Sequence, residues 1–239
     1  MTHLLLLVEG QAEEGFVKLS LGPHLASHGV HTTPIVIKTS RPASGGAQRG
    51  GVGNWATIKT NQRPMMGNKN QWVSTIIDFY GLPADFPGLQ ETLAASKSPR
   101  EAAAALQDRF HAEMKAETKH EKFIPFLALH EFEAWLFCSP DVVAEHFFGS
   151  GGKRDNMAGA MYRVLEEAGE PELIDQGKDT HPKARLKAAI AKAKAQGPEY
   201  NTKTDGPTLA QKTGIENIRR KCQHFNAWLE RLEGLGGQT

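Results

Sequence analysis

The stretch MTHLLLLVEGQAEEGFV, residues 1–17, decides the fold class. Its five consecutive apolar residues, Leu4 to Val8, are too few to cross a membrane and are typical of a strand buried on both faces of a parallel sheet. Glu9 follows at the carboxyl end of that strand, where ligands bind in open α/β sheets. A carboxylate there must be desolvated, paired or metal-bound. Glu13 and Glu14 would fall in the first turn of the next helix, where the helix dipole favours acids.

Two further apolar segments also end in acids. Residues 72–77 (WVSTII) have the β-branched content of a strand and lead into Asp78. The segment 123–129 (FIPFLAL) leads into Glu131 and Glu133, and its internal proline predicts an edge or bulged strand. One such acid could be a cap or turn residue, but three acidic strand ends in one α/β unit indicate a shared cation.

The hydrophobic pattern predicts an α/β fold with a central parallel sheet of about four strands and flanking helices, followed by a mainly helical C-terminal part. The expected elements are strands at 4–8, 33–38, 72–77 and 123–129, and helices at 12–28, 98–119, 156–168, 182–196 and 215–232. We expect an α/β domain at 1–148 and a helical extension at 149–239 packed on it. The glycine-rich stretch at 39–54 predicts a loop.

Composition and charge narrow the class of protein. The 239 residues include two cysteines, which cannot make a disulfide framework or a zinc site, and the N-terminus lacks a secretory signal, so we expect a cytoplasmic protein. Residues 15–77 carry seven Lys or Arg and no acid, and residues 178–221 carry eleven basic and four acidic residues. Two basic segments flanking acidic clusters fit a protein that binds a polyanion around a metal site, although ordinary solvated helix faces have the same composition.

Three stretches approach known motifs without matching them. The glycine run at 51–56 lies a dozen residues past its strand, so it is no dinucleotide-binding loop. The sequence after His130 has Ala134 where a zinc protease has its second histidine. The run ending at Lys153 lacks the first glycine and the Ser/Thr of a Walker A loop, so the chain has no recognisable ATPase site of its own. No Ser or Cys stands in a nucleophile-elbow context, so acyl transfer has no support.

Four stretches together resemble a bacterial family of unknown function with a Toprim-like fold. They are VEGQAE (8–13), DFYGLP (78–83), LHEFEAWLF (129–137) and HFNAWL (224–229). Toprim domains include the nuclease domain of the overcoming-lysogenization-defect nucleases. The resemblance implies Mg²⁺, or Mn²⁺, bound among Glu9, Glu13 and Asp78. Tyr80 stands where the wider Toprim pattern has a second aspartate, so the second ion would need a ligand from Glu131 or Glu133.

The function expected from this resemblance is Mg²⁺-dependent hydrolysis of phosphodiesters in DNA or another nucleic acid, with a separately encoded ATPase as partner in genome or phage defence. The expected ligands are Glu9, Asp78 and Glu131 for the first ion, and Glu13 and Glu133 for a second ion or its waters. Lys183 would stabilise charge on the phosphorane, although Arg185 and Lys187 would serve that role equally well.

The spacing of apolar residues after His130 favours a helix that begins there, with its positive end toward the acids. Residues two apart in a helix diverge by about 200°, so only one of Glu131 and Glu133 could face the metal. We therefore expect Glu131 nearest to Glu9 and Asp78, and Glu133 either toward the rim or behind the direct ligands of the metal.

Two alternatives stay open. A catalytically degenerate Toprim subunit would dock an ATPase without cleaving anything; the missing aspartate favours it and the retained acids disfavour it. A small-molecule phosphatase would lack extended basic surface. A topoisomerase would need a tyrosine nucleophile from another domain, so a nuclease fits better. No membrane partner is expected, and the oligomeric state is left open.

Overall fold

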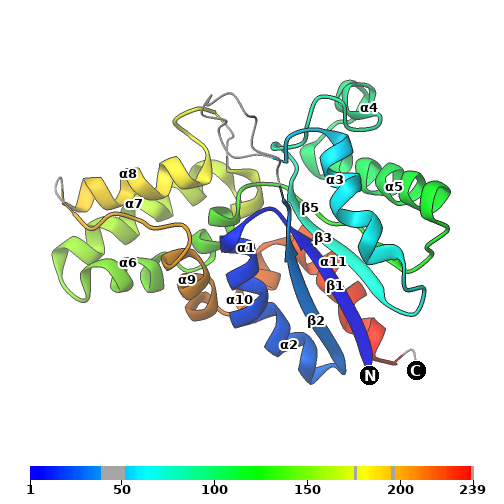
Figure 1. The fold of residues 1–239 in the computed structure, drawn as a ribbon. Coiled ribbons are helices and arrows are strands. Elements are labelled where there is room, and N and C mark those ends of the chain that lie inside the picture. Colours follow the sequence, from blue (N-terminus) through cyan, green and yellow to red (C-terminus); the bar gives the residue numbers. More distant parts are fainter. Residues whose placement is uncertain (39–51, 175–176, 195–196, 238–239) are drawn as a thin grey trace.

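The computed structural model describes residues 1–38, 52–174, 177–194 and 197–237, and it contains one parallel sheet (Figure 1). The strand order is β2-β1-β3-β4, and β5 also pairs with β3. The strands are β1 (Thr2–Val8), β2 (Val30–Val36), β3 (Trp72–Asp78), β4 (Phe123–Ile124) and β5 (Leu127–Ala128). The predicted α/β class with a parallel sheet and flanking helices is confirmed.

Helices cover both faces of the sheet, which explains the uninterrupted apolar run in β1. Leu4, Leu6 and Val8 belong to one buried cluster and Leu7 to a second cluster on the opposite face, as the alternation of side chains along a strand requires. All four side chains are fully buried. A strand with two covered faces has no position at which a polar side chain would meet water.

The first face is covered by both ends of the chain. From the N-terminal end come α1 (Gln11–Phe16), the π-helical turn η1 (Val17–Leu21) and α2 (Gly22–Ser27), which together confirm the helical stretch expected at 12–28. From the C-terminal end comes α11 (Gln223–Glu233). The indole N–H of Trp228 in α11 donates to the buried Ser74 hydroxyl of β3 at 3.0 Å, which ties this helix to the middle of the sheet.

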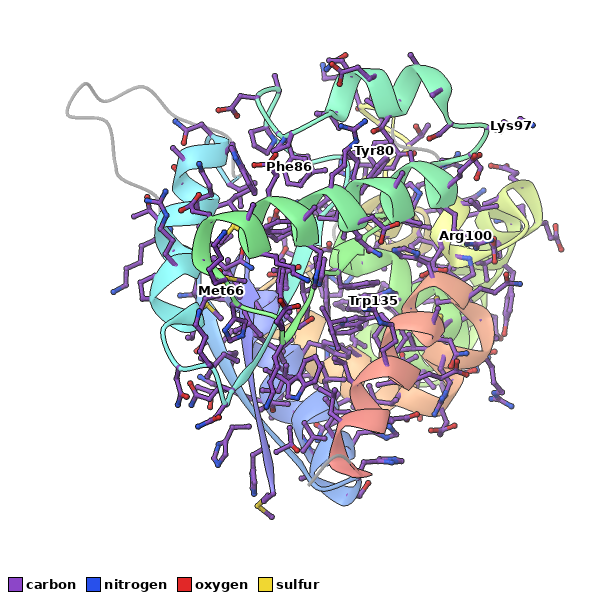
Figure 2. All side chains as sticks on the ribbon, turned by 90° about the vertical axis from the view of Figure 1, so that its right-hand side faces the viewer. Met66, Tyr80, Phe86, Lys97, Arg100 and Trp135 are labelled. Carbon is purple, nitrogen blue, oxygen red and sulfur yellow. The ribbon has the colours of Figure 1, made fainter. Side chains whose placement is uncertain are left out.

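The second face is covered by α3 (Trp55–Gln62) and α5 (Pro99–Thr118). Between strands also lie η2 (Arg63–Met66) and α4 (Leu89–Ala95). Ser98 caps α5 by accepting the N–H of Glu101 at 3.2 Å, and the helix falls where the sequence predicts it. Figure 2 looks onto α5, with Met66 and Phe86 beside it, Trp135 amid densely packed side chains, and Lys97 pointing outward.

The fourth apolar segment forms two short strands rather than one, as the internal Pro125 predicts. Both strands pair with β3, and the backbone between them is held by Thr75 instead of by strand pairing. The Thr75 hydroxyl donates to the carbonyl of Phe126 and accepts its N–H, each at 2.8 Å. After this interruption, β5 ends three residues before Glu131.

The rest of the chain is helical. Its elements are η3 (Phe132–Cys138), α6 (Pro140–Phe148), α7 (Gly152–Ala168), η4 (Pro171–Leu173), α8 (Pro182–Ala193), α9 (Asp205–Thr213) and α10 (Ile215–Lys221). The sequence did not indicate α9. The single helix expected at 215–232 is wrong: the chain breaks at Cys222, and the carboxylate of Glu172 accepts the N–H groups of His224 and Phe225 at 2.8 and 2.9 Å. Two new backbone donors are thereby satisfied.

The larger hydrophobic cluster joins the two predicted domains. It contains Leu6 of β1 and Leu229 of α11, which lie on either side of the expected boundary at 148. The boundary itself stays a prediction. The loop expected at 39–54 lies outside the described residues from 39 to 51. No helix among the described residues is both long enough and apolar enough to cross a membrane.

Candidate functional site

Parallel pairing brings Glu9 and Asp78 together. Val8 of β1 is in register with Ile76 of β3, so both strands end at the same edge of the sheet. The backbone N–H of Asp78 donates to the Glu9 carboxylate at 3.2 Å. Asp78 in turn accepts the N–H of Tyr80 at 2.9 Å, which holds its side chain at the strand end.

Glu13 reaches the same edge from α1. Its carboxylate accepts the N–H of Gly10 at 3.0 Å, the contact of a capping box, and the carboxylate therefore turns back over the N-terminus of the helix. Glu14 is held differently, because it forms a surface ion pair with Lys18 at 2.5 Å. Of the two acids in the first turn of α1, only Glu13 therefore lines the cavity at this edge of the sheet.

Glu131 is held by residues that approach it from the start of α8. The imidazole Nδ1 of His181 lies 2.7 Å from the Glu131 carboxylate, and the backbone N–H of Lys183 donates to it at 3.2 Å. The Lys183 ammonium lies 3.8 Å away. α8 thus places its first turn against the acid that follows β5, although the two segments are 50 residues apart in the sequence.

Glu133 lies inside the protein, so of the two places expected for it, the rim is wrong. Its side chain is 1% exposed, against 23% for Glu131. The Lys183 ammonium lies 3.4 Å from the Glu133 carboxylate, and the Tyr200 hydroxyl donates to it at 3.1 Å. The physical reason is that η3 begins only at Phe132: Glu131 is still extended (φ −47°, ψ 149°), so the two acids do not diverge as in a regular helix.

The acids are electrostatically coupled to one another. Burial raises the pKa of Glu9 to about 8, and the charges of Asp78, Glu13 and Glu131 act in the same direction. Burial also raises the pKa of Asp78 to about 7, assisted by Glu131 and Glu13 and opposed by backbone N–H donors. The pKa values of Glu13 and Glu133 are raised as well, again chiefly by burial.

Lys183 is the cationic counterpart within this set. Burial alone would lower the pKa of the Lys183 ammonium, but the carboxylates of Glu133 and Glu131 outweigh that effect and raise it. Lys183 therefore stays charged at neutral pH. Burial and the neighbouring Glu133 charge also raise the pKa of Tyr200, so this phenol remains a hydrogen-bond donor.

All six predicted residues line one cavity of about 420 Å³. They are Glu9, Glu13, Asp78, Glu131, Glu133 and Lys183. Among the described residues, three ligand atoms lie within 4.8 Å of one another only at His24, His28 and Glu233, so no three carboxylates of this cavity come that close together. Mg²⁺ keeps several waters and takes only one or two protein carboxylates directly, so it does not need three carboxylates at that distance. Carboxylates with raised pKa values are also the groups that a cation would stabilise, so these residues fit a divalent ion.

Sequence reasoning missed several residues of the site. His181 and Tyr200 hold acids in place, and Lys203 lines the cavity from the segment before α9. The rings of Tyr80 and His130 stack with centroids 5.0 Å apart. Isolated His, Tyr and Lys residues carry no periodic or motif signal, so tertiary contact alone identifies them.

The comparisons with known proteins place the chain in a family. The profile of the domain of unknown function DUF4276 matches residues 8–233. The chain belongs to the DUF4276 family. A search of curated proteins gave no match. Since the match spans positions 8 to 233, every acid of the cavity lies within the DUF4276 domain.

Two solved structures are similar to this DUF4276 chain. One is the C-terminal region of the Burkholderia pseudomallei OLD protein, at 16% identity and a TM-score of 0.35, with 98% of each chain covered. The other is the C-terminal region of the Xanthomonas campestris pv. campestris OLD protein, at 13% identity and a TM-score of 0.33, with 97% of this chain and 98% of that chain covered. At such values the likeness says nothing about chemistry, which the cavity's own side chains must supply.

Proposed function

We propose that this protein is a divalent-metal-dependent phosphodiesterase that acts on nucleic acid. The observation that carries the proposal is the cavity itself, in which acids from three strand ends and one helix turn meet a charged lysine. Buried carboxylates that repel one another are unfavourable without a cation. Active sites are where such perturbed groups concentrate.

Each side chain has a place in this proposal. A bound Mg²⁺ or Mn²⁺ would polarise the phosphate and lower the pKa of a water molecule. Glu9 and Asp78 would hold the ion at the strand ends, and Glu131 would reach it directly or through one of its waters. Lys183 would place its ammonium beside the phosphate charge that develops in the transition state. His181 would keep Glu131 from rotating away, and Tyr200 would do the same for Glu133.

The basic character of α8 supports a polyanionic substrate. The helix begins at the cavity with Lys183 and extends away from the sheet (Figure 1). Lys187 on this helix and Lys194 directly after it are exposed and line the same groove. A phosphate backbone seated in the cavity would meet these charges on its way out, which a small phosphorylated molecule would not do.

A degenerate adaptor is the second candidate, and Tyr80 is the observation that favours it. A tyrosine in place of the second acidic ligand, 42% exposed, reduces the hard oxygen donors at β3 to Asp78. An adaptor of this kind would bind an ATPase partner and leave nucleic acid intact. The nuclease also takes a separately encoded ATPase in this proposal, since the sequence has no Walker A loop.

Metal-dependent nicking of supercoiled plasmid DNA by the purified chain tests the proposal. We expect nicking with Mn²⁺ or Mg²⁺, none with EDTA, and none from Asp78→Asn. The matched control is Asp108→Asn, an acid on α5 away from the cavity, which should nick normally. No nicking by the wild type, alone or with an ATPase encoded beside it, together with intact ATPase binding, would establish the adaptor instead.

Salt dependence provides a separate measurement of substrate class. Binding of DNA by the wild type, measured without divalent ions, should weaken steeply as salt rises, because neutralised phosphates release counterions. Lys187→Ala and Lys194→Ala together should reduce the slope of log K against log salt by about 2, near 0.9 per lost phosphate contact. A slope that is unchanged in the double variant would place the nucleic acid elsewhere on the protein.

A further inference from the structure

A second cluster of ligand side chains lies at the opposite end of the sheet from the acidic cavity. His24 belongs to α2, His28 follows its C-terminus, and Glu233 is the last residue of α11. Nε2 of His24 lies 2.7 Å from a Glu233 carboxylate oxygen, and Nε2 of His28 lies 3.8 Å from the same oxygen. The three ligand atoms all fall within 4.8 Å of one another. Figure 1 shows this region beside the two chain termini, at the amino ends of the strands.

We propose that His24, His28 and Glu233 form a binding site for a transition-metal ion, with Zn²⁺ as the natural candidate. Two imidazoles and one carboxylate are the ligand types that Zn²⁺ takes, and a fourth position remains for water. In a tetrahedral site with bonds of about 2.0–2.1 Å, neighbouring ligand atoms stand about 3.3 Å apart. The distances of 2.7 and 3.8 Å from the two histidines to Glu233 bracket that value.

The ion would take the place of the proton that His24 and Glu233 now share. Both histidines must present a neutral nitrogen to the metal, and the N–H of His24 would then lie on Nδ1. The side chain of His28 is 41% exposed, which gives an ion a route in from solvent. The two histidines are four residues apart, the spacing that puts two side chains on the same face of a helix.

Arg219 is a cation beside this cluster, and its geometry is compatible with the site. Its guanidinium donates to both oxygens of Glu233, at 2.9 and 3.2 Å. Its positive charge lowers the affinity for any cation, but the two hydrogen bonds hold the carboxylate plane in place as outer-shell donors do around metal ligands. Each carboxylate oxygen has two lone pairs, so Arg219 and a metal can bind the same group.

A bound ion would link the two ends of the chain to each other. α2 follows directly on the elements that carry Glu9 and Glu13, and α11 is the last long helix. The ends already meet here, because the Thr2 hydroxyl donates to the carbonyl of Leu235 at 3.0 Å. An ion that binds only the folded chain stabilises it by mass action. The cavity at the other edge of the sheet takes no part, so this inference does not depend on the proposed nuclease.

Metal titration of the untagged, chelator-stripped chain tests the proposal. The protein carries Glu9→Gln and Asp78→Asn, so that ions in the cavity do not contribute. We expect one equivalent of Zn²⁺ to bind, the melting temperature to rise, and Co²⁺ to give the visible absorption of a tetrahedral site, while Mg²⁺ has no effect. His28→Gln should weaken Zn²⁺ binding by more than the roughly 10- to 100-fold that losing an outer-shell partner costs.

His31→Gln is the matched control, because His31 stacks on His3 at the neighbouring strand edge and is no part of the cluster. Its Zn²⁺ affinity should equal that of the parent chain. The proposal is overturned if micromolar Zn²⁺ does not bind, or if His28→Gln binds Zn²⁺ as tightly as the parent. Zn²⁺ binding by His24→Gln is interpreted only after circular dichroism shows that this variant is folded, since His24 is more buried than His28.

Discussion

Replacing Glu9 by Gln should make the metal-free protein more stable at neutral and alkaline pH. The folded protein raises the pKa of this carboxyl from 4.5 to about 8. Between those values the folded state keeps the proton that the unfolded state has lost, so the free energy of unfolding falls as pH rises. Glutamine is neutral at every pH and can still accept the N–H of Asp78 through its amide oxygen. The substitution therefore removes the pH-dependent loss of stability and keeps the hydrogen bond from the Asp78 N–H.

The magnitude follows from the size of the shift. Each pKa unit corresponds to about 1.4 kcal/mol, so ionisation of Glu9 costs about 3 kcal/mol at pH 7 and approaches about 5 kcal/mol well above pH 8. Below about pH 4.5 both states are protonated and the cost disappears. We expect Glu9→Gln to unfold at a higher urea concentration than the wild type at pH 8, and at nearly the same concentration at pH 5.

The assay is urea unfolding followed by circular dichroism in EDTA, at pH 5, 6, 7 and 8. Glu113→Gln on the exposed surface of α5 is the matched control and should shift the curves equally little at each pH. A difference between Glu9→Gln and the wild type that does not grow from pH 5 to pH 8 would refute the reasoning. Adding Mn²⁺ at pH 8 should stabilise the wild type and leave Glu9→Gln almost unchanged, since the charge that binds the ion is gone.

Three further variants test the contacts that hold the site and the chain ends. Tyr200→Phe removes the hydroxyl that donates to Glu133 and should lower the free energy of unfolding by about 1 kcal/mol in urea titrations. Glu172→Gln weakens the hydrogen bonds that the carboxylate accepts at the start of α11 and should cost about 1–3 kcal/mol, seen as a lower melting temperature. Gly236→Ala would place a Cβ against the carbonyl oxygen of His28, so we expect about 1–3 kcal/mol of destabilisation and faster proteolysis of the C-terminal turn. A wild-type protease pattern for Gly236→Ala would contradict the packing of that turn.

Local sequence carried much of the fold. Apolar runs of strand length at 4–8 and 72–77 predicted β1 and β3, because a strand with two covered faces has nowhere to place a polar side chain. The proline in the segment 123–129 predicted the interruption between β4 and β5. The same two apolar runs also marked Glu9 and Asp78 as strand-end acids. Apolar runs and prolines act over a few neighbouring residues, so a single sequence is enough to identify them.

Other features depended on contacts between distant segments. The break at Cys222 was invisible to periodicity, because the apolar spacing continues across it while the Glu172 carboxylate stabilises a new helix start. The burial of the Glu133 side chain could not be predicted locally, because Tyr200 and Lys183 contact it from segments 50 or more residues away.

The sequence by itself determined that acids stand at three strand ends and that the sheet is parallel. Only the tertiary structure decided how those acids are held, which of them are buried and which basic group faces them. The tertiary structure also decided the contact of His24 and His28 with Glu233. The spacing of the two histidines is local, but the third ligand comes from the other end of the chain. Strand and helix patterns are short-range consequences of burial, whereas a site is an arrangement of side chains that only the packed chain brings within bonding distance.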